Sequence, residues 1–319
     1  MFSKRSVFAY GAGFKRKRII KKALLAAILL ILLSLIPGIL EKFRSRGGNE
    51  RRELQHFFES SAFESAYTRS SEMLRERPLD AFLLTIHGFS SYQLAIAQIN
   101  NFDMLSYIND CIWALRKAML LNRTAQQNGR IFYVLGKAYY HKGPEYADLA
   151  VFYLEKARDA AFRAADIPEY LGLSYAAIGD FRSSVAAFAL ALTGDYAVNP
   201  GAVGPSDILL LSIARSYIGL EELESARAYL VHCLDVSRDS ITAATARLLL
   251  ADILLKTGDI QGAEAEYLKI VEENSENAEA HYQLGIIYAS MGDTTRARAE
   301  WRRALRIDPA HGPARSRLN

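Results

Sequence analysis

Hydrophobic positions follow two different patterns along this chain. Residues 23–40 read ALLAAILLILLSLIPGIL, one continuous apolar run without a charge. After this run, apolar residues alternate with charged ones in the manner of long amphipathic helices. The chain has eight prolines, and half of its residues are hydrophobic, so helices are seldom interrupted and can build a packed core. The pattern predicts an all-α protein with an apolar segment near its N-terminal end.

The apolar run is long enough for a transmembrane helix. At about 1.5 Å per residue it just covers a hydrocarbon core of about 30 Å, and Pro37 and Gly38 would bend or end the helix at its far side. The alternative is a cleaved signal peptide. The apolar region of such a peptide is usually shorter, and no small-x-small cleavage site follows this run, which continues Glu41-Lys42-Phe43-Arg44. We therefore predict an uncleaved signal anchor at residues 23–40.

Basic residues flank the run unequally. Residues 1–22 contain eight lysines and arginines and no acid, whereas residues 42–52 contain five basic residues. The positive-inside rule then places residues 1–22 in the cytoplasm and the rest of the chain outside it, as a single-pass protein of a bacterial-type inner membrane. Without residues 1–22 the formal net charge of +4 becomes −4. Because the basic charge belongs to this short segment, we expect no nucleic-acid binding by the remainder.

A recurrence of 34 residues marks the C-terminal part of the chain. Leu284-Gly285-x-x-Tyr288 is followed by Gly292-Asp293, and 34 residues earlier stand Leu250-Ala251-x-x-Leu254 and Gly258-Asp259. Three further copies lie upstream, with short insertions at residues 144–147 and 199–206. The copies occupy residues 129–164, 165–198, 207–240, 244–277 and 278–311. A fixed period of this kind indicates stacked structural repeats rather than an ordinary helical bundle.

The repeated residues resemble the tetratricopeptide repeat, in which L-G-x-x-Y on a first helix, A, precedes A-x-x-x-F, a small residue and a proline on a second helix, B. Gly or Ala at the eighth position lets helix A approach helix B of the same repeat. Gly-Asp suits the turn between them, because Gly tolerates positive φ and Asp caps the next helix. The resemblance implies an all-α, right-handed superhelical solenoid of helix-turn-helix repeats, preceded here by one transmembrane helix.

Both ends of the array depart from the repeat pattern. Residues 41–128 keep parts of it, such as Ala66, Gly88 and Leu115, around an enlarged inter-helix segment at residues 100–103. We interpret them as a linker followed by degenerate repeats. Residues 312–319 form a C-terminal tail that is too short for a polar capping helix. The sequence thus predicts an exposed apolar face around Trp301, available for self-association or for a partner.

No motif for catalysis or metal binding occurs. The six histidines never form H-x-x-x-H or H-E-x-x-H, and there is no P-loop and no G-x-S-x-G. Cys111 and Cys233 lie far apart in apolar stretches, which predicts buried thiols rather than a disulfide framework or a zinc site. The anchor and the repeats account for the whole chain. We therefore predict a protein that is not an enzyme and that has no cofactor and no metal.

The family resemblance also implies where a partner would bind. In tetratricopeptide proteins helix A lines the concave groove through its second, fifth, ninth, twelfth and thirteenth positions. Some members hold C-terminal carboxylates through an Asn at the ninth position, and no repeat here has one. The corresponding residues of this chain are Arg130, Tyr133, Lys137, Tyr140, His141, Leu173, Leu211, Arg215, Ile218, Leu248, Asp252, Leu255, Tyr282 and Ile286. With Lys and Arg in its N-terminal half, this groove suits an amphipathic or extended segment with some negative charge.

The resulting hypothesis is a membrane-anchored scaffold that mediates protein–protein interactions. Resemblance to the family implies a role in assembling or stabilising an envelope complex, and the partner's identity is beyond the sequence. Two alternatives stay open. One is an adaptor whose repeats face the cytoplasm, and the other is a carrier that holds an apolar ligand, such as a lipid, in the concave groove.

Overall fold

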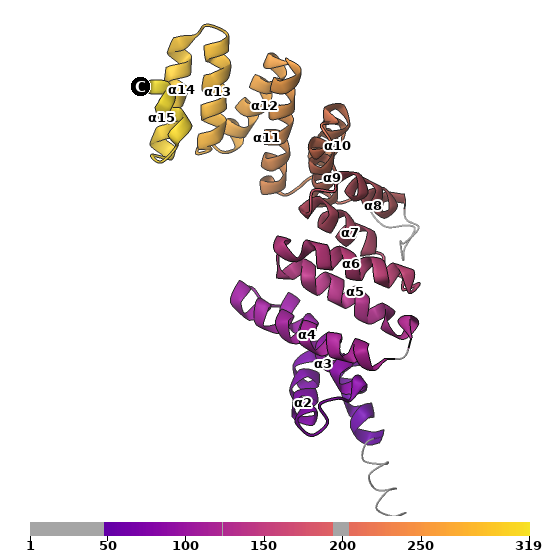
Figure 1. Cartoon of the computed structure of the whole chain (residues 1–319). Coiled ribbons are helices and arrows are strands. Elements are labelled where there is room, and N and C mark those ends of the chain that lie inside the picture. The colour runs from indigo at the N-terminus through magenta and orange to yellow at the C-terminus, as the bar shows by residue number, and fades with distance from the viewer. Residues whose placement is uncertain (1–47, 123, 194–203) are drawn as a thin grey trace, which may run out of the picture.

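The computed structural model describes residues 48–122, 124–193 and 204–319 of the chain, and every regular element in these ranges is helical (Figure 1). The predicted all-α fold is therefore confirmed for the described chain. In order, the elements are a helix over residues 48–59, α2 (Phe63–Glu76), α3 (Ala81–Ile96), α4 (Asn101–Leu121), α5 (Ala125–Lys142), the 3-10 turn η1 (Pro144–Tyr146), α6 (Ala147–Asp159), α7 (Ile167–Ala177), α8 (Phe181–Thr193), α9 (Asp207–Gly219), α10 (Leu223–Val236), α11 (Ser240–Thr257), α12 (Ile260–Glu273), α13 (Ala278–Ser290), α14 (Thr294–Ile307) and α15 (Gly312–Leu318).

Consecutive helices pair into antiparallel hairpins, which stack in chain order into an elongated, curved solenoid (Figure 1). The helix over residues 48–59 pairs with α2 through the ion pairs of Glu53 with Arg69 and of Glu50 with Arg77. The later pairs run from α3 and α4 to α13 and α14. We call the first helix of each pair helix A and the second helix B. Each hairpin packs on the next, so the fold repeats along one direction.

A small residue opposite a large one brings the two helices of a hairpin together. A Cβ placed on Gly136 of α5 would lie 2.5 Å from Leu154 Cγ of α6, and a Cβ on Gly172 would lie 2.5 Å from the Phe188 ring. Gly285 faces Trp301 in the same way. Such distances are too short for any side chain. The glycines at the eighth repeat position are therefore required by close helix packing.

The turns within the hairpins use the Gly-Asp pair as expected. Gly258 ends α11 with a φ of 86°, and Asp259 accepts a hydrogen bond of 2.9 Å from the Gly262 amide at the start of α12. The turns before α8 and α14 have the same arrangement. In the turn between α9 and α10, Glu221 adopts a φ of 61° where three other hairpins have Gly179, Gly258 and Gly292. A residue with a Cβ is strained in this conformation.

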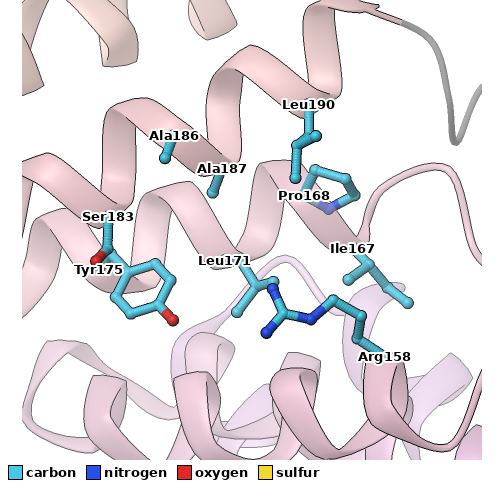
Figure 2. A pocket seen from close by; sticks show the side chains of 9 residues that line it. All are labelled: Arg158, Ile167, Pro168, Leu171, Tyr175, Ser183, Ala186, Ala187 and Leu190. Atoms are coloured by element: carbon cyan, nitrogen blue, oxygen red, sulfur yellow. The ribbon is translucent and has the colours of Figure 1, made fainter.

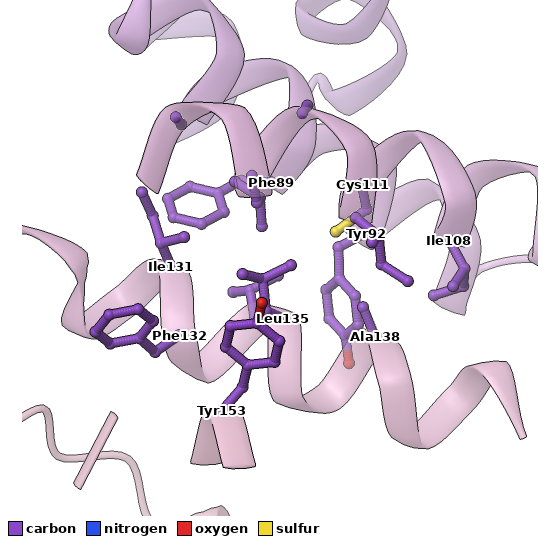
Figure 3. Close-up of a cluster of buried hydrophobic side chains, with 14 of the residues drawn as sticks. Phe89, Tyr92, Ile108, Cys111, Ile131, Phe132, Leu135, Ala138 and Tyr153 are labelled. Atoms are coloured by element: carbon purple, nitrogen blue, oxygen red, sulfur yellow. The ribbon is translucent and has the colours of Figure 1, made fainter. Parts of the chain in front are cut away.

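Buried side chains form two large clusters along the solenoid. One extends from Leu54 to Ala187, and Figure 3 shows part of it, where Ile108 and Cys111 of α4 face Leu135 and Ala138 of α5. The second extends from Leu210 to Ala314. A small third cluster, Phe188, Leu209 and Ile213, lies between α8 and α9 and connects them. Cys111 and Cys233 are fully buried free thiols, as the sequence predicts.

The N-terminal region is more regular than its sequence suggests. Residues 48–121 form two complete hairpins, and a Cβ on Gly88 of α3 would lie 2.5 Å from Leu115 Cγ of α4, the same packing as in the later repeats. The expectation of an enlarged inter-helix segment at residues 100–103 is wrong. Asn100 caps α4 by accepting a 2.8 Å hydrogen bond from the Asp103 amide, and the extra length instead extends α4 to 21 residues.

The C-terminal end also differs from its prediction. Residues 312–318 form a short helix, α15, whose Ala314 is fully buried against the last hairpin. Trp301 is 6% exposed because α13 and the C-terminal part of the second cluster cover it. The apolar face that we expected around Trp301 is therefore largely covered. This surface offers little apolar area for self-association.

The predicted membrane segment lies outside the described residues. Residues 1–22, the run at 23–40 and residues 41–47 all precede the first described helix. Within the described ranges, no helix combines the length and the apolar character needed to span a bilayer. The insertion at residues 199–206 is described only from residue 204, where Ser206 caps α9.

Candidate partner-binding face

Helices A of successive hairpins lie next to one another and share one side of the solenoid. Contacts join α3 to α5, α5 to α7, α7 to α9 and α9 to α11. The residues predicted from the family's groove positions lie on α5, α7, α9, α11 and α13. We call the surface formed by these helices and α3 the A-helix face. The solenoid therefore brings residues more than a hundred positions apart onto one side of the molecule.

The N-terminal half of the A-helix face has a lysine surrounded by tyrosines. The Lys137 ammonium lies 5.7, 5.1 and 4.6 Å from the ring centres of Tyr92, Tyr133 and Tyr170, which come from α3, α5 and α7. It also donates a hydrogen bond of 2.7 Å to the Asp166 carboxylate. The Lys137 side chain is 13% exposed. Its charge is thus already stabilised within the protein by cation–π contacts and an ion pair.

The surrounding polar groups complete a connected cluster. The Tyr133 hydroxyl donates to both carboxylate oxygens of Asp166, at 2.8 and 2.9 Å. Tyr140 packs edge-on against Tyr170, with ring centres 5.0 Å apart, and the Tyr170 hydroxyl lies 3.4 Å from His141 Nε2. We call Tyr92, Tyr133, Tyr140 and Tyr170 the tyrosine cluster. Packing and hydrogen bonds hold its rings in fixed orientations.

Burial shifts the titration of this cluster. It raises the pKa of Tyr170 to about 12, with Asp166 adding to the effect, and it also raises the pKa of Tyr133. The pKa of Glu169 is raised by burial and by the neighbouring Asp166 charge, whereas burial and Lys137 lower the pKa of His141. The tyrosines are therefore protonated hydrogen-bond donors at neutral pH, and His141 is uncharged.

The electrostatic expectation for this half of the face needs correction. The sequence prediction considered Arg130 and Lys137 but not the acids that the next repeat contributes. Asp166 neutralises Lys137, and Glu169 lies on the same helix as Tyr170. Arg130 is exposed and stacks at 4.8 Å from the Phe89 ring centre. This half has mixed charges on an aromatic base, so it shows no general preference for an anionic segment.

The C-terminal half of the A-helix face is more apolar. Arg215 and Asp252 are exposed, and Asp252 accepts a 2.6 Å hydrogen bond from the Tyr267 hydroxyl. Leu211 is 7% exposed and belongs to the core. The other predicted residues are partly exposed between neighbouring helices, and they are Leu173, Ile218, Leu248, Leu255, Tyr282 and Ile286. Tyr282 packs against His311, with ring centres 5.0 Å apart.

Sequence reasoning missed four members of the N-terminal cluster. Asp166 and Glu169 occupy the second and fifth groove positions of their repeat, and Tyr92 occupies the twelfth position counted from Gly88. The same positional rule could have found all three if it had been applied to every repeat and extended to α3. Tyr170 stands one position outside the rule, so the sequence has no signal for it.

The pockets of the described chain do not favour the apolar-ligand alternative. The pocket in Figure 2 has a volume of about 180 Å³ and lies where Arg158 of α6 reaches toward Leu171 of α7 and Leu190 of α8. This is below the range of about 300–1,000 Å³ that is usual for small-molecule sites. A wider pocket at the end of the array, beside Val271 and Arg306, has a largely polar lining. In the described ranges, no three His, Cys, Asp or Glu side chains are grouped for a metal ion.

Comparison with known proteins agrees with the geometry. The family model of the tetratricopeptide repeat matches residues 211–275 and 248–311. Among solved structures, the C-terminal part of a TPR repeat-containing protein from Cytophaga hutchinsonii superposes with a TM-score of 0.61 at 15% identity, covering 84% of this chain and 99% of that one. The pilF protein of Pseudomonas aeruginosa gives 0.51 at 14% identity, covering 72% and 95%. YrrB, described as a TPR protein with an unusual peptide-binding site, gives 0.50 at 19% identity, covering 64% and 96%.

These comparisons define the class of the protein. Residues 211–311 consist of tetratricopeptide repeats, and the described chain as a whole has the fold of a tetratricopeptide solenoid. No curated protein matches the chain. Proteins built from tetratricopeptide repeats generally mediate protein–protein interactions as scaffolds, and the fold is typical of proteins without catalytic activity.

Proposed function

We propose that this chain is a membrane-anchored scaffold that binds a segment of a partner protein along its A-helix face. The tyrosine cluster is the main observation in support. The rings of Tyr133, Tyr140 and Tyr170 are partly exposed, and such rings supply contact area and lose little conformational entropy on binding. Lys137 and Asp166 already hold the rings in place, so a partner would pay little to order them.

The proposed partner segment is an amphipathic helix or an extended stretch. Its apolar side chains would contact Tyr140 and the partly exposed leucines and isoleucines further along the face. Its polar groups would meet exposed charges of this surface such as Arg130, Arg215 and Asp252. A segment with charges of both signs therefore fits better than a uniformly acidic one.

Photo-crosslinking in native membranes tests the proposal. A photoreactive residue replaces Tyr140 or Arg215 on the A-helix face, and a control replaces Phe152 of α6, which is 48% exposed. We expect a discrete crosslinked product from positions 140 and 215, and its loss when Arg215→Glu is combined with the probe at position 140. Equal crosslinking from all three positions, or none from the A-helix face, would refute this binding mode.

The membrane part of the proposal is that residues 23–40 anchor the chain and that the repeats face away from the cytoplasm, where they would help to assemble or stabilise an envelope complex. The run of eighteen uncharged residues and the excess of basic residues before it support this topology. A compartment-sensitive reporter fused after Asn319 tests it. Activity outside the cytoplasm supports the envelope scaffold, and activity inside favours the cytoplasmic adaptor.

A further inference from the structure

The outer side of α4 carries an exposed apolar stripe. Phe102, Trp113 and Leu120 are 83%, 48% and 79% exposed. They are eleven and seven residues apart, close to three and two full helical turns, so they lie on one side of the helix. Cys111 and Leu115, on the opposite side, are fully buried, and Figure 3 shows Cys111 facing the core. Ile99, just before α4, is also fully exposed.

A lysine and an arginine border the stripe. Arg116 and Lys117 flank it, and the Lys117 ammonium lies 4.0 Å from the Trp113 ring centre. The acids of α4, Asp103 and Asp110, project about 60–100° away from the stripe, on the flank of Lys117. Asp110 also accepts a 2.7 Å hydrogen bond from Tyr67. An apolar helix side with Trp and Lys at its border is typical of helices that lie in a membrane interface.

The stripe is particular to this hairpin. The position of Trp113 is occupied by Phe152 in α6, and it is Ala in every later helix B, at Ala186, Ala228, Ala265 and Ala299. Phe152 also has a lysine four residues on, at 4.9 Å from its ring centre. However, the outer side of α6 carries Asp148, Glu155 and Asp159 where α4 carries Asn109, Arg116 and Leu120. An anionic surface would therefore attract α4 and repel α6.

The proposed anchor would place α4 close to the bilayer, and this step rests on the proposed function. Seven residues lie between Leu40 and Gly48, and the eight residue-to-residue steps span at most about 29 Å when fully extended. The helix over residues 48–59 packs on α3, where Arg51 pairs with Asp80 at 3.3 Å. Helix α3 packs directly on α4. Only α3 therefore separates α4 from the helix over residues 48–59.

From these observations we infer that the outer side of α4 lies on the surface of an anionic lipid bilayer. Phe102 and Leu120 enter the acyl boundary, Trp113 lies at the level of the headgroups, and Lys117 contacts lipid phosphates, whereas Arg116 interacts with Tyr139 of α5. Helix α4, about 31 Å long, then runs parallel to the membrane. The solenoid is held at two points, the anchor and α4, which fixes the direction of the A-helix face relative to the bilayer.

Fluorescence quenching in the full chain tests the inference. The chain is reconstituted into vesicles of phosphatidylcholine and phosphatidylglycerol whose acyl chains carry bromine. Trp113 and Trp301 are the two tryptophans, and Trp301 is 6% exposed on α14, so Trp113→Phe gives the signal of Trp301 alone. We expect bromolipid to lower the Trp113 emission about two-fold. We expect Leu120→Asp to relieve this quenching.

A matched control comes from the next hairpin. Phe152→Trp in the Trp113→Phe background places a tryptophan at the same repeat position, and the native residues are equally exposed at 48%. Quenching at position 113 but not at 152 supports the inference. Equal quenching at both positions, or none at 113, overturns it, and a protein crosslink from position 113 in unquenched samples would show that a partner covers α4 instead.

Two measurements on native membranes distinguish this inference from the proposed function. Extraction at alkaline pH reports whether the chain is anchored, and crosslinking at position 140 reports partner binding. An anchored chain that crosslinks its partner while Trp113 stays unquenched overturns the contact of α4 with lipid and leaves the scaffold intact. A chain that is removed by alkaline extraction and is unquenched refutes both the anchor and the lipid contact.

Discussion

The N-terminal hairpins, residues 48–193, and the C-terminal hairpins, residues 207–307, share one packing scheme and differ in the sequence signal for it. The tetratricopeptide model matches the C-terminal hairpins and not the N-terminal ones. Nevertheless, Gly88 meets Leu115 in the first region as Gly285 meets Trp301 in the second. A small residue opposite a large one is thus enough to close each hairpin. The other repeat positions are then available for different side chains.

The two regions use this freedom differently. The N-terminal hairpins carry the tyrosine cluster on one side and the α4 stripe on the other. The C-terminal hairpins have Ala at the position of Trp113 and regular Gly-Asp turns in their last two hairpins. Only the α4 stripe coincides with a departure from the repeat pattern, because the tyrosine cluster lies mainly on α5 and α7, which keep that pattern. The C-terminal hairpins continue the A-helix face with a more apolar surface that includes Arg215 and Asp252.

Disruption of the junction between the two regions should have the largest effect. Phe188 is fully buried in the small cluster that connects α8 and α9, and truncating such a ring costs about 3–5 kcal/mol. For Phe188→Ala we expect the single unfolding transition of the solenoid to split into two, because neighbouring repeats stabilise each other across this contact. Denaturation followed by circular dichroism measures it. The exposed control Phe152→Ala should change stability by less than about 0.5 kcal/mol.

Overpacking of the hairpins tests whether the two regions are closed by the same contact. Gly88→Val and Gly285→Val should each destabilise by about 1–3 kcal/mol, because the new side chain meets Leu115 or Trp301. The free energy of unfolding in urea is the measurement. A neutral Gly88→Val beside a costly Gly285→Val would show that the N-terminal hairpin is not built like the others.

Relief of backbone strain should give a smaller effect of opposite sign. Glu221 has a φ of 61° in the turn between α9 and α10, where the next two hairpins have Gly258 and Gly292. Glu221→Gly should stabilise the chain by about 1 kcal/mol, because Gly accepts this conformation without a steric penalty. The reverse change, Gly258→Ala, should cost a similar amount. Melting temperatures of the two variants check the pair, and equal signs would contradict the assignment of strain.

Mild acid should weaken the N-terminal hairpins first. Burial lowers the pKa of His87 and of His141, so below the ordinary value of 6.5 the unfolded chain binds protons that the folded chain does not. Their contribution to stability is complete above about pH 6.5 and is lost as the pH falls. The melting temperature should therefore drop between pH 7.5 and 5.5. The drop should shrink in the double variant His87→Gln, His141→Gln, but not in His232→Gln, whose native residue is exposed.

Prediction from sequence worked best where one residue decides a local contact. Gly136, Gly258 and Asp259 have roles that follow from sterics and hydrogen bonding within about thirty residues, and the structure agrees with them. It failed where a contact joins separate repeats. Lys137 was predicted as a charge for a partner, but Asp166, 29 residues later, neutralises it from the loop before α7. We assigned residues 100–103 to an inter-helix segment because helices of this repeat are usually shorter. In the structure residues 101–103 belong to α4, which has 21 residues.

The sequence by itself determined the helical class, the solenoid architecture of the repeats and the apolar segment at residues 23–40, because each depends on periodicity or on a run of like residues. Tertiary structure alone decided which side chains remain available. It enclosed Lys137 among three tyrosines, covered Trp301 and left Trp113 exposed. The physical reason is that stacking brings together residues from different repeats, and their mutual burial and pairing depend on inter-helix distances that no single repeat specifies.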